Sequence, residues 1–347
     1  MARPRTTHRF VLAGMVVLLG VSILAGVAFG SVGISPVTSV QLFAWKLHLA
    51  ARPAGVPEST VLILFQLRLP RVLLGALVGA ALAAAGTLFQ ALFRNPMADP
   101  AIIGVSSGAA LGAILVILAG GGAVAGGLAI PGAAFLGAVA TAFLVYRLAR
   151  LGPSVQVATL LLSGIAVAAI ISACISMVMT LSGQDIRSIY FWLLGGLGSA
   201  SWQRLALAVP FVVLGVALAV SRAGDLNLTA LGEERAGQLG LEVEGFKRLM
   251  LGTGSILTAA AVSVSGLIGF VGLMTPHILR LVVGSDHRRL LPASILGGAS
   301  FMILADLAAR TAIRPEEIPV GAVTALLGGP FFLYLLRRER RAAGAGA

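Results

Sequence analysis

The chain has 347 residues, of which 58% are hydrophobic and 11% are charged, whereas soluble domains carry roughly 25% charged residues. This composition excludes an ordinary soluble domain and indicates a polytopic membrane protein. The formal net charge of +12 does not indicate nucleic-acid binding, because the basic residues are dispersed between apolar runs. Cys174 is the single cysteine and the four histidines are scattered, so neither a disulfide framework nor a metal site is predicted.

Apolar blocks suited to membrane-spanning helices follow one another along the chain. The first, from Val11 to about Gly30, follows the basic N-terminus and is longer than the apolar core of a signal peptide, which predicts a retained helix. An amphipathic connection around Pro36 to Pro57 comes next. The further blocks lie near 61–93, 101–120, 128–150, 155–181, 202–221, 247–265, 267–284, 292–312 and 318–336. The sequence therefore predicts an all-α fold of ten transmembrane helices, in a single domain over residues 1–347.

Two boundaries in this series are irregular. Pro70 interrupts the second block, and only Gly266 and its neighbours separate 247–265 from 267–284. One helix of the latter pair is expected to be short or irregular, and such backbone must be buried in protein or line a cavity. Small residues also recur every four positions, which predicts close helix packing within the chain. These runs are Gly75, Gly79 and Ala83, and Gly104, Gly108 and Gly112.

The distribution of lysine and arginine predicts the orientation. Ten spans place both termini on one side of the membrane, and the positive-inside rule assigns the more basic side to the cytoplasm. The less basic side carries Lys46, Arg52, Arg68, Arg71, Arg187, Arg204, Arg310 and Arg314. The termini and the polar segment 222–248 are therefore predicted to be cytoplasmic.

Segment 222–248 is the longest polar passage between two apolar blocks. Its charged residues are costly to place in lipid, and leucines are interleaved with them. Gly232, Gly237 and Gly240 punctuate the run, which predicts short amphipathic helices broken at glycines and lying against a membrane face. A solvated loop is the alternative.

Four motifs carry a resemblance to a known family. They are the stretches Leu67 to Gly112, Gly266 to Pro276 and Ala305 to Gly329, and ALGEERAGQLGL within segment 222–248. They occur along the chain in the order expected for the family, and from about residue 60 to 337 they resemble the permease subunits of type II ABC importers for iron complexes, haem and vitamin B12. The resemblance implies a multi-pass protein of the inner membrane that works as two copies flanking a central path. It also implies two ATPase subunits in the cytoplasm and a periplasmic substrate-binding protein.

The lysines give an independent argument about ATP. A Walker A motif needs Gly-Lys followed by Ser or Thr, and neither Lys46 nor Lys247 follows a glycine. The chain is therefore not expected to be a P-loop ATPase or an enzyme, and no cofactor of its own is predicted. ATP and Mg²⁺ would be used by the partner ATPase.

By resemblance, segment 222–248 holds the helices that couple the permease to the ATPase. Its charged residues can make charge-assisted contacts, while its leucines supply apolar contact. The predicted coupling residues are Leu231, Gly232, Glu233, Glu234, Arg235, Gln238, Leu239 and Gly240.

Arg68, Arg71 and Arg310 lie on the external side, against the positive-inside bias. In the family, arginines at such positions face glutamates of the binding protein, and the planar guanidinium binds carboxylates bidentately. Snorkelling to the headgroup layer is the alternative.

Asp306 is the one acid well inside an apolar run. It is expected to pair with Arg310, four residues on, rather than to serve as a proton relay, because a relay needs several ionisable groups. His277 is not expected to ligate haem, because its PH-x-x-R pattern recurs in the family irrespective of substrate.

The fifth span, 155–181, is the predicted wall of the translocation path, where small hydroxyls and thioethers give a surface without a deep binding well. The residues assigned to one face of it are Thr159, Ser163, Ser172, Ser176, Met177 and Met179. The alternative is that these hydroxyls bond only to their own helix backbone.

The stretches DIRSIYFWLLGGLGSASW and RNPMADPAIIGVSSGAALG resemble haem-type members, so haem is the expected substrate. Ferric siderophore is second and vitamin B12 third. An ion-coupled secondary transporter would need more buried ionisable groups than Asp306 and Arg310. A membrane enzyme would need clustered His, Asp or Glu, and the nearest candidate, Asp286 to Arg289, is interpreted as a basic cytoplasmic turn.

Overall fold

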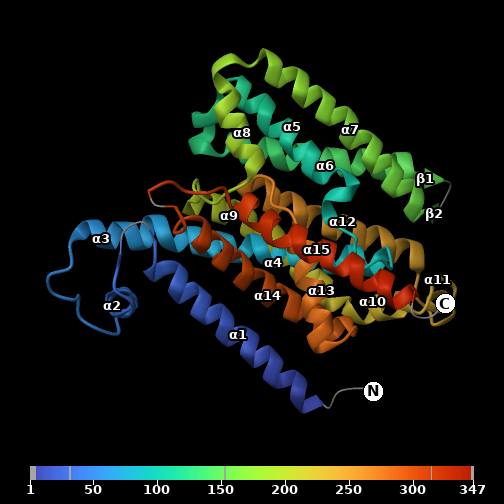
Figure 1. The fold of residues 1–347 in the computed structure, drawn as a ribbon, viewed down its shortest axis with the longest axis horizontal. Helices are drawn as coiled ribbons and strands as arrows, with labels where there is room; N and C mark the ends of the chain where they lie inside the picture. The colour runs from blue at the N-terminus through green and yellow to red at the C-terminus, as the bar shows by residue number, and fades with distance from the viewer. Residues whose placement is uncertain (1–4, 31–32, 152–153, 314, 345–347) are drawn as a thin grey trace.

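The computed structural model describes residues 5–30, 33–151, 154–313 and 315–344. Both extreme ends of the chain lie outside this range, as does Arg314 of the charge count. Most described residues are helical (Figure 1). Each of the ten predicted apolar blocks contains an apolar α-helix.

Eight described helices are long and apolar enough to cross a membrane. These spans are α1 (Arg5–Ala28), α4 (Leu69–Leu92) with the residues leading into it, α6 (Ala129–Ala149), α7 (Val157–Leu181), α9 (Trp202–Ser221), α12 (Val243–Ser265), α14 (His287–Ala309) and α15 (Val320–Gly344). The two remaining blocks hold the shorter apolar helices α5 (Val105–Leu118) and α13 (Val271–Val283).

Short elements connect the spans. They are α2 (Pro36–Lys46), α3 (Glu58–Leu62), the π-helix η1 (Ile63–Arg68), the 3₁₀ helices η2 (Pro100–Ile103), η3 (Gly121–Gly127) and η4 (Gly183–Asp185), α8 (Ile186–Leu194), α10 (Ala223–Ala230) and α11 (Glu233–Gln238). The turn between α6 and α7 contains a two-residue antiparallel pair, β1 (Arg150–Leu151) with β2 (Ser154–Val155).

Helices α4 and α12 form the centre of the molecule. In each of these two spans, 78% of the apolar 18-residue stretch is buried inside the protein, whereas only 11% of the corresponding stretch of α7 is buried. Glycine permits this close packing: a Cβ on Gly79 would collide with the Gly298 carbonyl of α14 and lie 2.6 Å from the Met302 Cβ. A Cβ on Gly108 would likewise collide with the Gly137 carbonyl of α6. The predicted intramolecular role of both small-residue runs is confirmed.

The predicted break at Pro70 is wrong. The helix runs without interruption from Glu58 to Leu92, through α3, η1 and α4. Pro70 lies in the first turn of α4, directly after the wide π-helical turn. At this position the chain tolerates a residue without a backbone N–H donor.

The predicted irregularity around Gly266 is confirmed. Residues 266–270 are not helical, Gly266 has φ +70° and Phe270 has φ +68°. A Cβ on Gly266 would collide with the Trp192 carbonyl, and the Gly196 N–H donates to the Ser265 carbonyl at 2.7 Å. The non-helical backbone is therefore packed inside protein, and α13, with 13 residues, is the short helix of the pair.

The spans run along the long axis of Figure 1. The start of α1 and the end of α15 lie at the same end of the molecule as α10 and α11, which we call the α11 end. Helices α2 and α3 lie at the opposite end, which we call the α3 end. An even number of crossings accounts for this arrangement.

Candidate functional site

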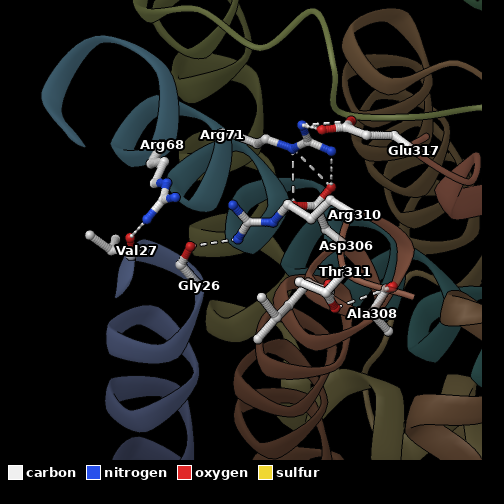
Figure 2. A network of polar contacts seen from close by, with 10 residues as sticks. Gly26, Val27, Arg68, Arg71, Asp306, Ala308, Arg310, Thr311 and Glu317 are labelled. Carbon is white, nitrogen blue, oxygen red and sulfur yellow. Dashed lines mark hydrogen bonds and ion pairs between the residues drawn. The ribbon is translucent and has the colours of Figure 1, made fainter. Parts of the chain in front are cut away.

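A buried ion network lies at the α3 end (Figure 2). Asp306, on the last turns of α14, is 2% exposed. Its Oδ1 accepts hydrogen bonds from Arg71 Nε at 3.0 Å and from Arg71 Nη2 at 2.9 Å. Arg310 Nε lies 3.3 Å from the Asp306 Oδ2 atom. The predicted Asp306–Arg310 pair is confirmed, and Arg71 joins it from α4.

Glu317 extends this network towards solvent. It lies between α14 and α15, its side chain is 43% exposed, and its Oε2 is 2.9 Å from Arg71 Nη1. Positive and negative groups therefore alternate from Glu317 through Arg71 and Asp306 to Arg310. Such pairing offsets the desolvation cost that an isolated charge would carry. The expectation that only Asp306 and Arg310 are buried ionisable groups at this depth is wrong, because Arg68 is also buried, at 4% exposed, and Arg71 is mostly covered, at 13% exposed.

Two arginines also bind the end of α1 (Figure 2). Arg68 Nη1 donates to the Val27 carbonyl at 2.9 Å and to the Ala28 carbonyl at 2.8 Å. Arg310 Nη2 donates to the Gly26 carbonyl at 2.5 Å. The last carbonyls of a helix have no partner within it and carry partial negative charge. Arg68 and Arg310 therefore fasten α1 to α4 and α14.

The structure brings the three predicted docking arginines together at one end but buries their guanidinium groups. Arg68 and Arg310 are each 4% exposed, and Arg71 is covered by the Glu317 carboxylate. Direct contact between these arginines and a substrate-binding protein stays a prediction. Of the three, Arg71 pairs with an accessible side chain, Glu317, which is 43% exposed.

A cavity of about 650 Å³ opens beside this network. Arg71 and Glu317 form part of its wall, and α8 contributes Phe191 and Trp192. Arg204, from the first turn of α9, also lines it and donates from Nη1 to the Ser199 hydroxyl. The wall thus combines aromatic faces with charged groups, a combination suited to binding an amphipathic ligand. In the sequence, only its expected external position distinguishes Arg204.

At the opposite end, the polar segment forms α10 and α11. Helix α10 buries Ala223, Leu226 and Thr229, whereas α11 buries only Ala236. The chain breaks at Gly232 (φ +112°) and at Gly240 (φ +90°), as predicted. Gly237 does not break it, because this residue lies inside α11.

Most predicted coupling residues are on the outer side of this segment. Leu231 is 54% exposed and Leu239 is 61% exposed. Glu234, Arg235 and Gln238 are exposed between them. The segment therefore presents two leucines and a set of polar groups that no other part of the described structure covers.

Glu233 is the exception, because it binds within the chain. Lys247 Nζ on α12 lies 3.1 Å from Glu233 Oε2 and 3.0 Å from Glu244 Oε1. Arg94 Nη2 is 3.9 Å from Glu233 Oε1. Glu233 therefore fixes α11 on the first turns of α12, and the exposed coupling surface consists of its neighbours.

A second contact joins α10 to the start of α14. Asn227 Oδ1 accepts from the His287 backbone N–H at 2.8 Å and lies 2.8 Å from His287 Nδ1. Asn227 Nδ2 donates to Asp286 Oδ1 at 2.7 Å, and this oxygen also accepts the Arg288 N–H at 3.0 Å. The interpretation of Asp286 to Arg289 as a turn is wrong for three of its four residues, because His287, Arg288 and Arg289 form the first turn of α14 and Asp286 is its N-cap residue. Through Asn227 this cap links α10 to α14.

This cap affects the ionisation of Asp286. Partial burial opposes the charged carboxylate, but the hydrogen bonds from Asn227 and Arg288 and the positive charges of Arg289 and Arg288 outweigh it. The pKa of Asp286 is therefore lowered from its ordinary value.

The six residues assigned to a translocation face on α7 do not share a face. Successive residues of an α-helix are rotated by about 100°. Thr159, Ser163 and Met177 therefore lie on one side, and Ser172, Ser176 and Met179 lie on nearly the opposite side. The Ser176 hydroxyl donates to the Ser172 carbonyl at 3.0 Å, which is the backbone bonding considered as the alternative.

His277 packs against α15. Its ring centroid is 5.9 Å from that of Phe331, at an interplanar angle of 78°. This edge-to-face contact gives the residue a packing role between α13 and α15.

The chain is similar to known membrane transport proteins in both sequence and fold. The sequence model of the FecCD transport family matches residues 17–338. The cobalamin import system permease protein BtuC of Halobacterium salinarum is 50% identical over 290 residues, covering 83% of this chain and 77% of that protein. The hemin transport system permease protein HmuU of Yersinia pestis is 44% identical over 281 residues, covering 80% and 84%. The solved structure of a metal-chelate type ABC transporter in an inward-facing conformation matches with a TM-score of 0.82 and 31% identity, covering 95% of this chain and 99% of that one.

Proposed function

Because the chain belongs to the FecCD transport family, we propose that it is the membrane-spanning subunit of an ATP-driven importer for a metal-bearing macrocycle. The family consists of transport permeases, and its named relatives serve import systems for cobalamin and hemin. The observation that carries the proposal is the extent of the match, which runs from α1 to α15 and includes α10 and α11.

We propose that the α11 end faces the cytoplasm and binds an ATPase subunit. The exposed Leu231 and Leu239, with Glu234 and Arg235 between them, form a surface of mixed character. Leucines of this kind fit an apolar groove, and the charged pair supplies orientation and charge-assisted contacts. Two copies of the chain would each carry one ATPase subunit, with the translocation path between the copies.

We propose that the α3 end receives a substrate-binding protein. Arg71 already pairs with the half-exposed Glu317 carboxylate at 2.9 Å. A glutamate of the binding protein can replace Glu317 there, because one carboxylate substitutes for another on the same guanidinium edge. Arg68 and Arg310 would support this position by holding α1, α4 and α14 together.

Helix α14 connects the two ends in this mechanism. Its first residues bind α10 through Asn227, and its last turns carry Asp306. ATP binding in the partner would displace α10 and α11, and α14 would carry that displacement to the ion network. The expected result is alternating access, in which the path opens first to one side and then to the other.

For the substrate, two macrocycles are candidates. The 50% identity to a cobalamin permease favours cobalamin, and it exceeds the 44% identity to a hemin permease. The loop and turn sequences around α8 and η2 resemble haem-type members, which favours haem. We place cobalamin first and haem second.

The test is uptake into proteoliposomes that contain this chain and its ATPase, with the binding protein outside and ATP inside. Cobalamin, haem and a ferric siderophore would be supplied separately at the same concentration. Accumulation of cobalamin, or of haem, supports the macrocycle proposal and decides between the two. Accumulation of the siderophore alone would keep the importer and reject the macrocycle.

A further inference from the structure

A narrow cleft near the α11 end is not part of either site described above. Its volume is about 300 Å³, and it lies between α6 and α12. The lining residues are Val139, Ala142, Phe143 and Tyr146 from α6, Arg248, Leu251, Gly252, Ser255 and Ile256 from α12, and Ile103 and Leu160. Within each helix these positions recur at intervals of three and four residues, so each helix contributes one continuous stripe.

Most of the cleft is apolar. Ile103 and Leu160 are 4% and 3% exposed. The Ser255 hydroxyl donates to the carbonyl of Leu251 in its own helix at 2.7 Å, so it does not need a partner in the cleft. The rim includes Phe143, which is 63% exposed, and Ile256, which is 38% exposed. Because α6 and α12 span the bilayer, the exposed apolar side chains of this rim face hydrocarbon. A lipid acyl chain therefore matches the cleft in polarity and location.

The end of the cleft nearest α11 is polar. Arg248 lies on the first turns of α12, and Tyr146 lies on the last turns of α6. Arg248 Nε donates to the Glu244 carbonyl at 3.3 Å, while the Glu244 carboxylate is taken by Lys247. Among the described residues, no acidic side chain forms an ion pair with Arg248. Its guanidinium therefore keeps donors for an anion at the mouth of the cleft.

From this arrangement we infer that the cleft binds an anionic phospholipid of the leaflet at the α11 end. One acyl chain lies along the stripe that contains Ala142 and Gly252. The phosphate accepts charge-assisted hydrogen bonds from Arg248 and a further one from the Tyr146 hydroxyl. Basic groups between transmembrane helices on the cytoplasmic side are suited to lipid headgroups of this charge. The inference depends on the membrane-spanning fold and on this orientation, and it does not depend on the transported substrate.

The bound lipid has a consequence for the coupling segment. Arg248 directly follows Lys247, which holds α11 through Glu233. A lipid that bridges α6 and the first turns of α12 therefore stabilises the base on which α11 rests.

Gly252 offers a variant that removes the space without disturbing the protein. A Cβ at this position meets no atom within 4 Å. Gly252→Leu therefore fills the cleft, and its unfolding temperature in lipid-free detergent should equal that of the wild type or exceed it. Arg248→Gln removes the cation and keeps the cleft. Arg147→Gln removes an exposed arginine beside Tyr146 that does not line the cleft, and it is the charge-matched control.

The experiment is native mass spectrometry of the full-length chain in detergent, titrated with phosphatidylglycerol or with phosphatidylcholine of identical acyl chains. The wild type should bind one phosphatidylglycerol at least tenfold more tightly than phosphatidylcholine. Arg248→Gln should remove that preference, Gly252→Leu should weaken both lipids, and Arg147→Gln should behave as the wild type. Equal phosphatidylglycerol binding by the wild type and both cleft variants would overturn the proposal. An equal loss in Arg147→Gln and Arg248→Gln would also overturn it, because general surface charge would then account for binding.

Discussion

Asp306 and Arg71 are separated by 235 positions in the sequence and are joined by three hydrogen bonds, two to Asp306 Oδ1 at 2.9 and 3.0 Å and one to Oδ2 at 3.1 Å. These hydrogen bonds connect α14 to α4 at the α3 end. At the other end, the Asn227 side chain connects α10 to the start of α14 by hydrogen bonds to Asp286 and His287. A single helix therefore carries a polar connection at each end, and this is the physical basis for the transmission proposed between the ATPase surface and the outer face.

Replacement of Asp306 by Asn should be severely destabilising. It would leave Arg71 and Arg310 with positive charges in a buried site without their carboxylate. Removal of one partner from a buried ion pair costs about 3–5 kcal/mol. Thermal unfolding of the purified chain in detergent measures this loss. Glu317→Gln is the control, because Glu317 is 43% exposed and should contribute under about 1 kcal/mol. Equal effects of the two variants would contradict the network as described.

Glu317→Gln also tests docking. Loss of this carboxylate frees the outer edge of Arg71, so affinity for the substrate-binding protein should rise by a factor of about three to ten, equivalent to roughly 1 kcal/mol. Surface plasmon resonance with the immobilised permease complex measures this affinity. Glu316→Gln, at the exposed neighbouring position, is the control and should leave affinity unchanged. If affinity falls in Glu317→Gln, Glu317 itself contacts the partner and the exchange on Arg71 is rejected.

Gly79→Ala should disrupt the contact between α4 and α14. The new methyl group would collide with the Gly298 carbonyl, which belongs to rigid helix backbone. Overpacking of this kind costs about 1–3 kcal/mol. The matched control is Gly20→Ala in α1, where a Cβ meets no atom within 4 Å. Because alanine favours helix more than glycine does, the control should be neutral or stabilising, and comparable loss in both would argue against the close approach.

The double variant Glu234→Ala, Arg235→Ala should leave the fold intact, because both side chains are exposed. It should weaken association with the ATPase roughly tenfold or more, equivalent to at least about 1.4 kcal/mol, and substrate uptake should fall with it. The charge-matched control is Arg52→Ala, Glu58→Ala, which removes an exposed ion pair at the opposite end of the molecule. Normal coupled uptake in the first variant would remove α11 from the coupling mechanism.

The lowered pKa of Asp286 predicts an acid-dependent loss of stability. The charged carboxylate is favoured in the folded state, so its contribution is complete above the unfolded pKa of about 3.9. That contribution is lost as pH falls through the lower folded pKa. Asp286→Asn should therefore flatten the stability profile below about pH 4. An unchanged acid profile in the variant would show that other carboxylates account for it.

Hydropathy was sufficient to place the spans, because the thickness of the bilayer imposes about 20 apolar residues on each long helix. The breaks at Gly232 and Gly240 were also predictable, since glycine readily adopts positive φ. The Arg71–Asp306 contact was not. It depends on how α4 and α14 pack, and no local pattern links positions so distant in sequence.

Helix α7 shows a different limit. Its buried positions, Val167, Ile171 and Ile175, are no more apolar than exposed positions such as Leu162 and Ile170. Hydrophobicity therefore does not distinguish the faces of this helix. The predicted polar face failed because a rotation of about 100° per residue places its six members on opposite sides of α7. The π-helical entry to α4 was missed because Pro70 usually marks an interruption, whereas here a wide turn precedes it.

The energy source for uptake shows most directly whether this chain is the permease of an ATP-driven importer. Proteoliposomes holding this chain and its ATPase, with loaded binding protein outside, would be compared with ATP inside and with an imposed proton or sodium gradient alone. We expect accumulation that requires ATP and is unaffected by collapse of the gradient. Accumulation driven by the gradient without ATP would contradict the assignment as an importer permease and favour an ion-coupled transporter.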